Sequence, residues 1–143
     1  MVRKITELEK VLIQKSKPPD RTSHFLNKAV KLGLENKYAE SIVCLDRVIR
    51  INPNIPSAWH YKGTALNALG QFQEAIICLK KTIELHQNWC ETWNQKGIAY
   101  ANLQKYFEAI TCFEKAIKFD TDNQSAYTEN KARAIKEQEE NNV

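Results

Sequence analysis

The chain has 143 residues, of which 43% are hydrophobic and 27% charged, and its 21 Lys and Arg against 17 Asp and Glu give a net charge of +4. This balance is typical of a globular domain and excludes an intrinsically disordered chain, which would have fewer apolar residues and a larger net charge. The basic residues are concentrated in the first 50 positions but are not tightly clustered, so we do not expect nucleic acid as a partner.

No stretch of the sequence approaches the roughly 18 consecutive apolar residues of a transmembrane helix, so we expect no membrane insertion. The first 17 residues include basic side chains but no continuous apolar core, which argues against a secretory signal. We therefore expect a cytoplasmic protein whose four cysteines remain thiols.

Residues 1–19 are predicted to form a short amphipathic helix that ends at the Pro18-Pro19 pair. Its apolar face consists of Ile5, Leu8, Val11 and Leu12. Three roles are open to such a helix: it can pack on the helices that follow, bind a partner, or lie back on a ligand-binding surface. We expect it to pack on its neighbours as an N-terminal cap.

Residues 22–123 contain a repeat with a period of 34 residues. Identical residues recur between 56–89 and 90–123, among them Trp59/Trp93, Gly63/Gly97, Ala75/Ala109 and Cys78/Cys112. The preceding segment, 22–55, keeps the same register through Phe25, Tyr38, Cys44 and Leu45. A period of roughly 20 to 50 residues predicts a solenoid in which each repeat is one supersecondary unit.

Each repeat has the pattern of two helices. In 56–89, Pro56 stands where a first helical turn tolerates a missing N–H, and Gly70 marks the turn between the helices. Apolar or small residues recur at helical spacing, namely Trp59, Gly63, Leu66 and Leu69 in the first helix and Phe72, Ala75, Leu79 and Ile83 in the second. No unit can bury these faces alone, so neighbouring units must stack.

The pattern W-x3-G-x2-[LY]-x5-[FY]-x2-A-x3-[LF] over 34 residues resembles the tetratricopeptide repeat (TPR), and it is most similar to the AW-x2-KG subtype found in archaea, cyanobacteria and protists. The resemblance implies an all-α fold, a right-handed superhelical solenoid of stacked antiparallel helix pairs. We place the units at 22–55, 56–89 and 90–123. The mostly polar residues 124–140 are predicted to form a C-terminal capping helix, because a terminal helix must expose one face to water.

We predict no catalytic residue, cofactor or metal site. Cys44, Cys78 and Cys112 recur on successive second helices, but stacked helices lie roughly 10 Å apart. A disulfide needs Cα atoms within about 7 Å, and zinc needs four converging ligands. We therefore expect these cysteines to be buried packing residues. The three histidines do not recur in register, and the sequence contains no phosphate-binding loop or nucleophile motif.

A second ladder pairs a lysine with a glutamate twelve residues later in each unit: Lys28/Glu40, Lys62/Glu74 and Lys96/Glu108. We hypothesise that each pair forms an ion pair across its helical hairpin, with the lysine stem lying over the core. The alternative is two independent rows of solvated side chains, since exposed pairs contribute only about 0–1 kcal/mol.

In tetratricopeptide repeat proteins the first helices line a concave groove, and the resemblance assigns the positions that face it. The candidate groove residues are Leu26, Asn27, Val30, His60, Tyr61, Thr64, Asn67, Asn94, Gln95, Ile98 and Asn102. The amide side chains can each donate and accept hydrogen bonds to an extended peptide backbone. Tyr61 would add a large contact area. These residues predict a neutral peptide as the ligand.

Some members of this family bind the C-terminal carboxylate of cytosolic chaperones with Lys, Asn, Asn, Lys and Arg at set groove positions. This chain has Leu26, Val30, Tyr61, Glu91 and Gln95 at those positions. A glutamate in place of a lysine would repel a carboxylate, so we expect no such clamp.

The resemblance thus implies a non-catalytic interaction module, an adaptor or scaffold that binds a protein, peptide or partner helix in its groove. The alternative is a structural subunit of a larger assembly that uses its convex face and its termini. Three units and a cap lie near the minimum for a stable solenoid, which leaves self-association through a solenoid end open.

Overall fold

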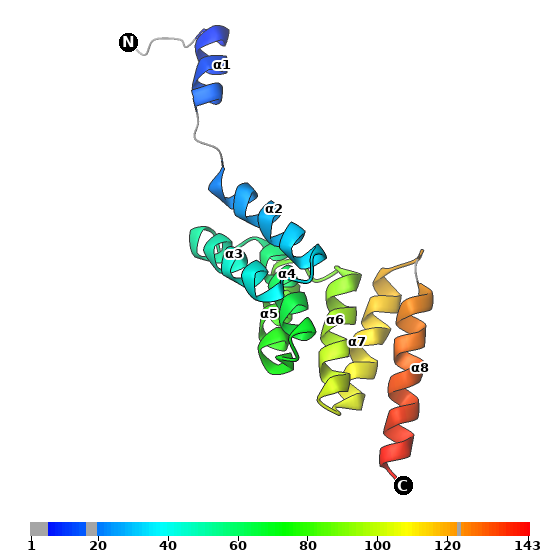
Figure 1. Ribbon diagram of the computed structural model, residues 1–143. Helices are drawn as coiled ribbons and strands as arrows, with labels where there is room; N and C mark the ends of the chain where they lie inside the picture. The colour runs from blue at the N-terminus through cyan, green and yellow to red at the C-terminus, as the bar shows by residue number, and fades with distance from the viewer. Residues whose placement is uncertain (1–5, 17–19, 123) are drawn as a thin grey trace.

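The computed structural model describes residues 6–16, 20–122 and 124–143, and all regular structure in these ranges is α-helical (Figure 1). The helices are α1 (Glu7–Ser16), α2 (Arg21–Leu34), α3 (Tyr38–Ile51), α4 (Pro56–Ala68), α5 (Phe72–Leu85), α6 (Cys90–Asn102), α7 (Tyr106–Phe119) and α8 (Gln124–Asn141). The predicted all-α class is confirmed.

Helices α2 to α7 form three hairpins, α2/α3, α4/α5 and α6/α7, and each hairpin packs on the next (Figure 1). The second helix of one hairpin contacts the first helix of the following one, and α8 packs on α7 in the same way. The first helices also contact one another, in the order α2, α4, α6, α8. The predicted helical solenoid is therefore confirmed, and one of its sides is lined by first helices.

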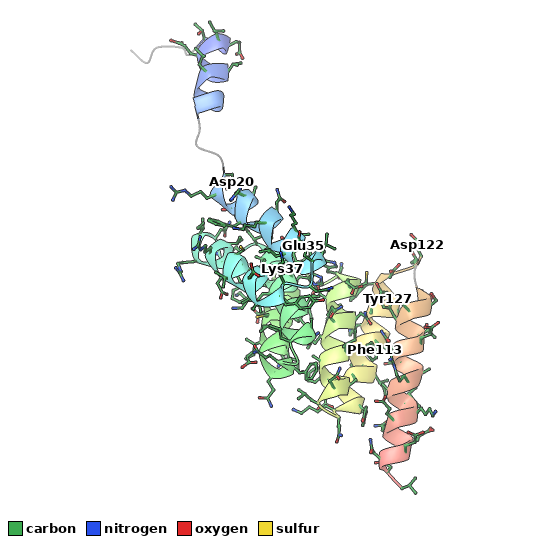
Figure 2. All side chains as sticks on the ribbon, in the orientation of Figure 1. Asp20, Glu35, Lys37, Phe113, Asp122 and Tyr127 are labelled. Carbon is green, nitrogen blue, oxygen red and sulfur yellow. The ribbon has the colours of Figure 1, made fainter. Side chains whose placement is uncertain are left out.

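The helix ends have local causes. At the start of α2, the Asp20 carboxylate accepts hydrogen bonds from the Thr22 backbone N–H at 3.0 Å and the Ser23 hydroxyl at 2.7 Å (Figure 2). These bonds, that from Ser23 first, lower the pKa of Asp20. Such a cap satisfies backbone donors that the first turn would otherwise leave unpaired.

The turn inside each hairpin has a residue with positive φ at the same position of the repeat: Asn36 (60°), Gly70 (75°) and Gln104 (60°). The following backbone N–H then bonds to a carbonyl five residues back, as in Gln71 N to Leu66 O at 2.9 Å. Glycine adopts this conformation without strain, and asparagine more readily than most residues. The sequence indicated this turn only at Gly70.

The two helices of a hairpin approach most closely at Gly63 and Gly97. A Cβ atom at Gly63 would lie 2.6 Å from Leu79 Cγ, and one at Gly97 would lie 2.5 Å from Phe113 Cε1. Both facing side chains are fully buried between the helices, as the position of Phe113 in Figure 2 illustrates. A larger residue at either glycine would therefore push into packed core atoms.

The recurring tryptophan ties each hairpin to the loop before it. Trp59 Nε1 donates a hydrogen bond to Pro53 O, and Trp93 Nε1 donates one to Gln87 O, both at 2.7 Å. In the first hairpin Phe25 takes this position, and the Arg47 guanidinium lies 5.2 Å from its ring centre.

The predicted ion pairs across each hairpin do not form among the described residues, so this hypothesis is wrong. Lys62 Nζ instead lies 2.7 Å from Asp46 Oδ1 of the preceding hairpin. The 34-residue register places Lys80 at the next position equivalent to Asp46, and Lys96 packs 5.0 Å from the ring centre of Trp93. Burial there lowers the pKa of Lys96. The charge on the neighbouring helix decides the pairing, which the separation within one hairpin could not indicate.

The cysteines of the ladder are free and buried, which confirms that Cys44, Cys78 and Cys112 are packing residues. Burial raises the pKa of Cys112 to about 11 and also raises the pKa of Cys78. Both thiols are therefore poor nucleophiles at neutral pH.

The terminal helices differ from each other. Helix α8 packs on α7 and buries Tyr127 and Ala134. Helix α1 lies beyond the start of α2 and contacts none of the other described helices, so the expected packing as a cap is not observed (Figure 1). Ile5 and the Pro18-Pro19 pair lie outside the described residues.

We predict that Gly97→Ala lowers the free energy of unfolding by about 1–3 kcal/mol, because the new Cβ meets the immobile Phe113 ring. Gly33→Ala is the matched control, since its Cβ would meet nothing closer than Ser41 Oγ at 4.0 Å. It should gain about 0.5–1 kcal/mol from the better helix propensity of alanine. Urea denaturation followed by circular dichroism measures both. Equal effects of the two substitutions would contradict this account of the packing.

Candidate functional site

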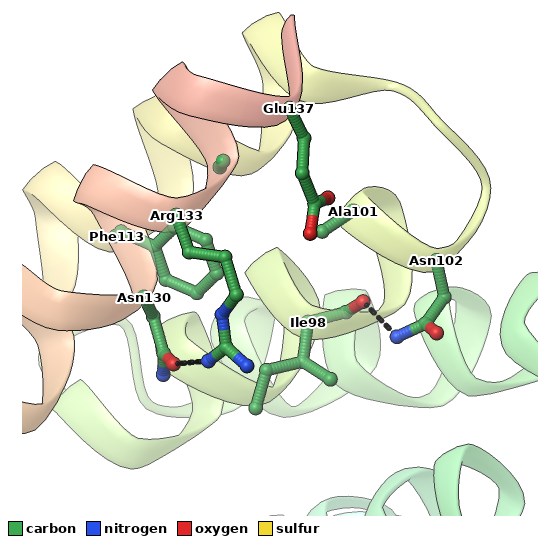
Figure 3. A pocket seen from close by; sticks show the side chains of 8 residues that line it. Ile98, Ala101, Asn102, Phe113, Asn130, Arg133 and Glu137 are labelled. Atoms are coloured by element: carbon green, nitrogen blue, oxygen red, sulfur yellow. Dashed lines mark hydrogen bonds between the residues drawn. The ribbon is translucent and has the colours of Figure 1, made fainter. Parts of the chain in front are cut away.

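The surface lined by α2, α4, α6 and α8 is the candidate site, and we call it the groove. It contains two cavities. The α2/α4 cavity measures about 250 Å³, and its walls include Val30, Leu34, Tyr38, Ser41, Tyr61 and Thr64. The α6/α8 cavity measures about 330 Å³, and its walls include Ile98, Asn102, Phe113, Asn130, Arg133 and Glu137 (Figure 3).

The α2/α4 cavity has an apolar surface because its hydroxyl groups are already bonded. Ser41 Oγ donates to Ala29 O at 2.8 Å, and Thr64 Oγ1 donates to His60 O at 3.0 Å. Leu34 is 81% exposed at its rim. The cavity can therefore take an apolar group without leaving a buried polar atom unpaired.

The α6/α8 cavity is polar and charged on its α8 side. The Arg133 and Glu137 side chains both point into it (Figure 3), and neither forms an ion pair with any described residue. Arg133 donates to the Asn130 side-chain oxygen, and Asn102 Nδ2 donates to Ile98 O at 2.8 Å. An arginine and a glutamate side by side can bond the carbonyl and the N–H of a ligand's backbone.

The structure brings three predicted groove residues to the first cavity and two to the second. Val30, Tyr61 and Thr64 line the α2/α4 cavity, and Leu26 packs in the same apolar cluster as Tyr61. Ile98 and Asn102 line the α6/α8 cavity. Asn27 is exposed on α2.

His60 is a predicted groove residue that the structure buries instead. Its Nδ1 lies 2.9 Å from Thr92 Oγ1, and its ring stacks on Trp89 with centroids 4.2 Å apart. Desolvation lowers its pKa from 6.5 to about 4. His60 therefore joins α4 to α6 as a neutral imidazole and is not available to a ligand.

The amide side chains also act mainly between repeats. Asn67 Nδ2 donates to Gln95 O at 2.9 Å, and Asn94, which is buried, accepts from Asn130 Nδ2 at 2.9 Å. Gln95 Nε2 donates to Glu91 Oε1 at 3.1 Å. The surface of free amides is thus smaller than the sequence predicted, because the stacking of repeats consumes several of them.

Sequence reasoning missed Tyr38, Asn130, Arg133 and Glu137. Residues of α8 were considered only as a cap, although the 34-residue step from Ala99 leads to Arg133 and would have placed it beside the groove. Tyr127 was also missed as a contact of the groove: its hydroxyl lies 3.4 Å from Glu91 Oε2 and donates to it. Burial, first of all, raises the pKa of Tyr127.

Two other kinds of site were checked within the described ranges. No helix there is long and apolar enough to cross a membrane. No group of three or more His, Cys, Asp or Glu side chains there is placed to hold a metal ion.

Two regions of the chain match models of the tetratricopeptide repeat, residues 44–77 and 90–123. The first of these regions begins inside α3 and ends inside α5, half a repeat out of phase with the predicted unit 56–89. The predicted tetratricopeptide repeats are thereby confirmed. No curated protein matches the chain.

Solved structures of other proteins share the fold. The first TPR domain of human RPAP3 is 20% identical, with a TM-score of 0.80 over 86% of this chain and 96% of that one. The Sgt2 TPR domain from Aspergillus fumigatus is 18% identical, with a TM-score of 0.80 over 87% and 83%. The first TPR of Spaghetti (RPAP3), bound to the HSP90 peptide SRMEEVD, is 20% identical, with a TM-score of 0.78 over 83% and 94%.

We predict that the protein loses stability as the pH falls from about 6.5 to about 4, because unfolded His60 binds a proton more tightly than folded His60. The contribution is fully present above the unfolded pKa, and about 2 kcal/mol of it should be lost at about pH 5. Urea denaturation at about pH 7 and pH 5 measures this loss. His60→Asn should reduce the difference between the two pH values, and an unchanged difference would show that other groups cause it.

Proposed function

We propose that the chain is a non-catalytic protein–protein interaction module that holds a peptide or a partner helix in its groove. The observation that carries this proposal is the α2/α4 cavity, an apolar hollow of about 250 Å³ that the chain's own side chains do not fill. Cavities with apolar walls and a few fixed polar groups nearby are the usual form of a binding site.

The α2/α4 cavity would hold an apolar side chain of the ligand against Val30, Leu34 and Tyr61. Full burial of one Leu or Phe side chain contributes about 1.5–3 kcal/mol. A single such anchor, placed against a rigid aromatic side chain, is typical of the energetic centre of an interface.

The α6/α8 cavity would hold the ligand's backbone. Arg133 can donate to a peptide carbonyl, while Glu137 can accept from a peptide N–H. Because the two charges offset each other, a neutral peptide suits this cavity better than one with a large net charge. The exposed amide of Asn102 lies at the same cavity and can add a further bond.

The proposal does not include a carboxylate clamp, although one of the similar structures is a complex with the HSP90 peptide SRMEEVD. Leu26 and Tyr61 pack in an apolar cluster, and Glu91 is bonded to Gln95 and Tyr127. A terminal carboxylate would meet a carboxylate and apolar side chains at positions where a clamp needs cations. The AW-x2-KG subtype likewise stays a prediction.

A second candidate function is that of a structural subunit that uses its opposite face. Val43 and Ile77, 34 residues apart on α3 and α5, are 56% and 66% exposed. Exposed apolar residues at equivalent positions of successive repeats would suit a flat partner. Each is isolated on its own helix, however, and no cavity surrounds either one among those described.

We predict that Tyr61→Ala and Leu34→Glu each weaken the binding of peptides selected from a random display library by at least about tenfold, the equivalent of 1.4 kcal/mol. Leu34 is so exposed that its substitution should not affect folding. Ile77→Ala is the matched control on the opposite face and should leave affinity unchanged. Fluorescence anisotropy measures the dissociation constants. A loss with Ile77→Ala alone would favour the structural subunit instead.

We also predict that the peptide SRMEEVD binds no better with a free C-terminal carboxylate than as the C-terminal amide, because Glu91 repels an added negative charge. Isothermal titration calorimetry compares the two peptides. Tighter binding of the free acid would restore the clamp interpretation.

A further inference from the structure

Helix α1 is well formed by its own sequence. Thr6 and Glu9 make a reciprocal capping box, with Thr6 N 2.9 Å from Glu9 Oε2 and Glu9 N 3.2 Å from Thr6 Oγ1. Lys10 Nζ lies 2.7 Å from Glu7 Oε1 one turn away. These local contacts explain why the segment is helical without help from the rest of the chain.

The apolar face of α1 has no partner among the described residues. Leu8 is 71% exposed and Leu12 57%, and Val11 beside them is also exposed. A helix of 10 residues is marginal in water without tertiary packing, since isolated helices need about 12–15 residues. Helix α1 therefore needs an apolar surface to pack on.

The nearest surface of the same chain is unsuitable. Every exposed residue of α2 except Leu34 is polar or charged, and four of them are His24, Arg21, Lys28 and Lys31. Packing leucines against this surface would desolvate charged groups without compensation. This explains why α1 does not cap the solenoid.

The α2/α4 cavity is the apolar surface that suits α1. Amphipathic helices bind grooves through anchors at positions i, i+3 and i+4, which is the spacing of Leu8, Val11 and Leu12. The cavity offers Val30, Tyr61 and the exposed rim residue Leu34.

The connection between α1 and α2 favours a cavity on another molecule. It contains four residues, and two of them are the adjacent prolines Pro18 and Pro19. Proline fixes φ and also restricts the residue before it, so this sequence favours an extended chain. The cavity lies at the end of α2 remote from this connection, and the 14 residues of α2 span about 20 Å. Helix α1 points away from its own cavity (Figure 1).

We infer that α1 of one copy docks in the α2/α4 cavity of a second copy, whose α1 docks in the first. Such an exchange is symmetric, because the same two surfaces meet twice about a two-fold axis. It goes beyond the proposed function, since it requires no outside ligand. It also makes dimer formation and ligand binding compete for one cavity.

Mixing two single-cysteine variants of the full chain tests this inference, both in a Cys90→Ser background because Cys90 is the one partly exposed native thiol of the described residues. Leu8→Cys is mixed with Leu34→Cys under mild oxidation, and the control mixture pairs Leu8→Cys with Ile77→Cys. Both partner positions are well exposed, so neither variant should fail to fold. A disulfide requires Cα atoms within about 7 Å.

We expect the disulfide-linked pair to form at least about tenfold faster in the Leu8/Leu34 mixture than in the control, as seen on a non-reducing gel. Equal rates would mean random collision and would overturn the inference. A chain carrying both Leu8→Cys and Leu34→Cys must give linked dimers, whereas a monomer with an internal disulfide would show that α1 docks on its own chain. Peptide binding lost with Tyr61→Ala would still stand in either case, so the two proposals fail separately.

The association itself gives a second measurement. Leu8→Ala with Leu12→Ala should raise the dimer dissociation constant at least about tenfold, because each leucine loses buried apolar area. Val43→Ala, on the opposite face, should leave it unchanged. Sedimentation velocity over a concentration series of the full chain measures all three. A chain that stays monomeric throughout the series, or a dimer that only Val43→Ala weakens, would overturn the inference.

Discussion

The close approach of the two helices in each hairpin is the constraint on which the rest of the structure depends. At Gly63 and Gly97 there is no room for a Cβ atom, because Leu79 and Phe113 occupy that space. These large side chains complete the buried core of their hairpins. Each hairpin leaves one apolar face to its neighbour, so the solenoid is stable only as a stack.

Contacts between hairpins then decide which polar groups a ligand can reach. His60 with Thr92, Asn67 with Gln95, and Asn94 with Asn130 all bond across successive first helices. Each bond satisfies a polar group that stacking removes from water, which avoids the cost of leaving it unpaired. What remains for binding is the space that these contacts do not fill, an apolar cavity between α2 and α4 and a charged one between α6 and α8.

The N-terminal helix and the groove are two surfaces of complementary chemistry in one chain. One presents leucines without a partner, and the other is an apolar cavity without an occupant. If they meet between copies, a ligand gains access to the cavity by displacing a helix of the second copy. The affinity for an outside ligand would then depend on protein concentration, because a dimer and a ligand compete by mass action.

The sequence by itself determined the helix pairs, their 34-residue period, the buried cysteines and the groove residues Val30 and Tyr61, because periodic apolar positions and small residues report packing directly. It did not determine the partner of Lys62, the burial of His60 or the turns at Asn36 and Gln104. These depend on which side chain a neighbouring helix brings within reach, a distance that spacing along one hairpin does not contain. Only the tertiary structure decided that α8 contributes Arg133 and Glu137 to a cavity and that α1 stands apart. The physical reason is that periodicity identifies the buried face of a helix, whereas a site is made by residues of separate helices that meet only in the stack.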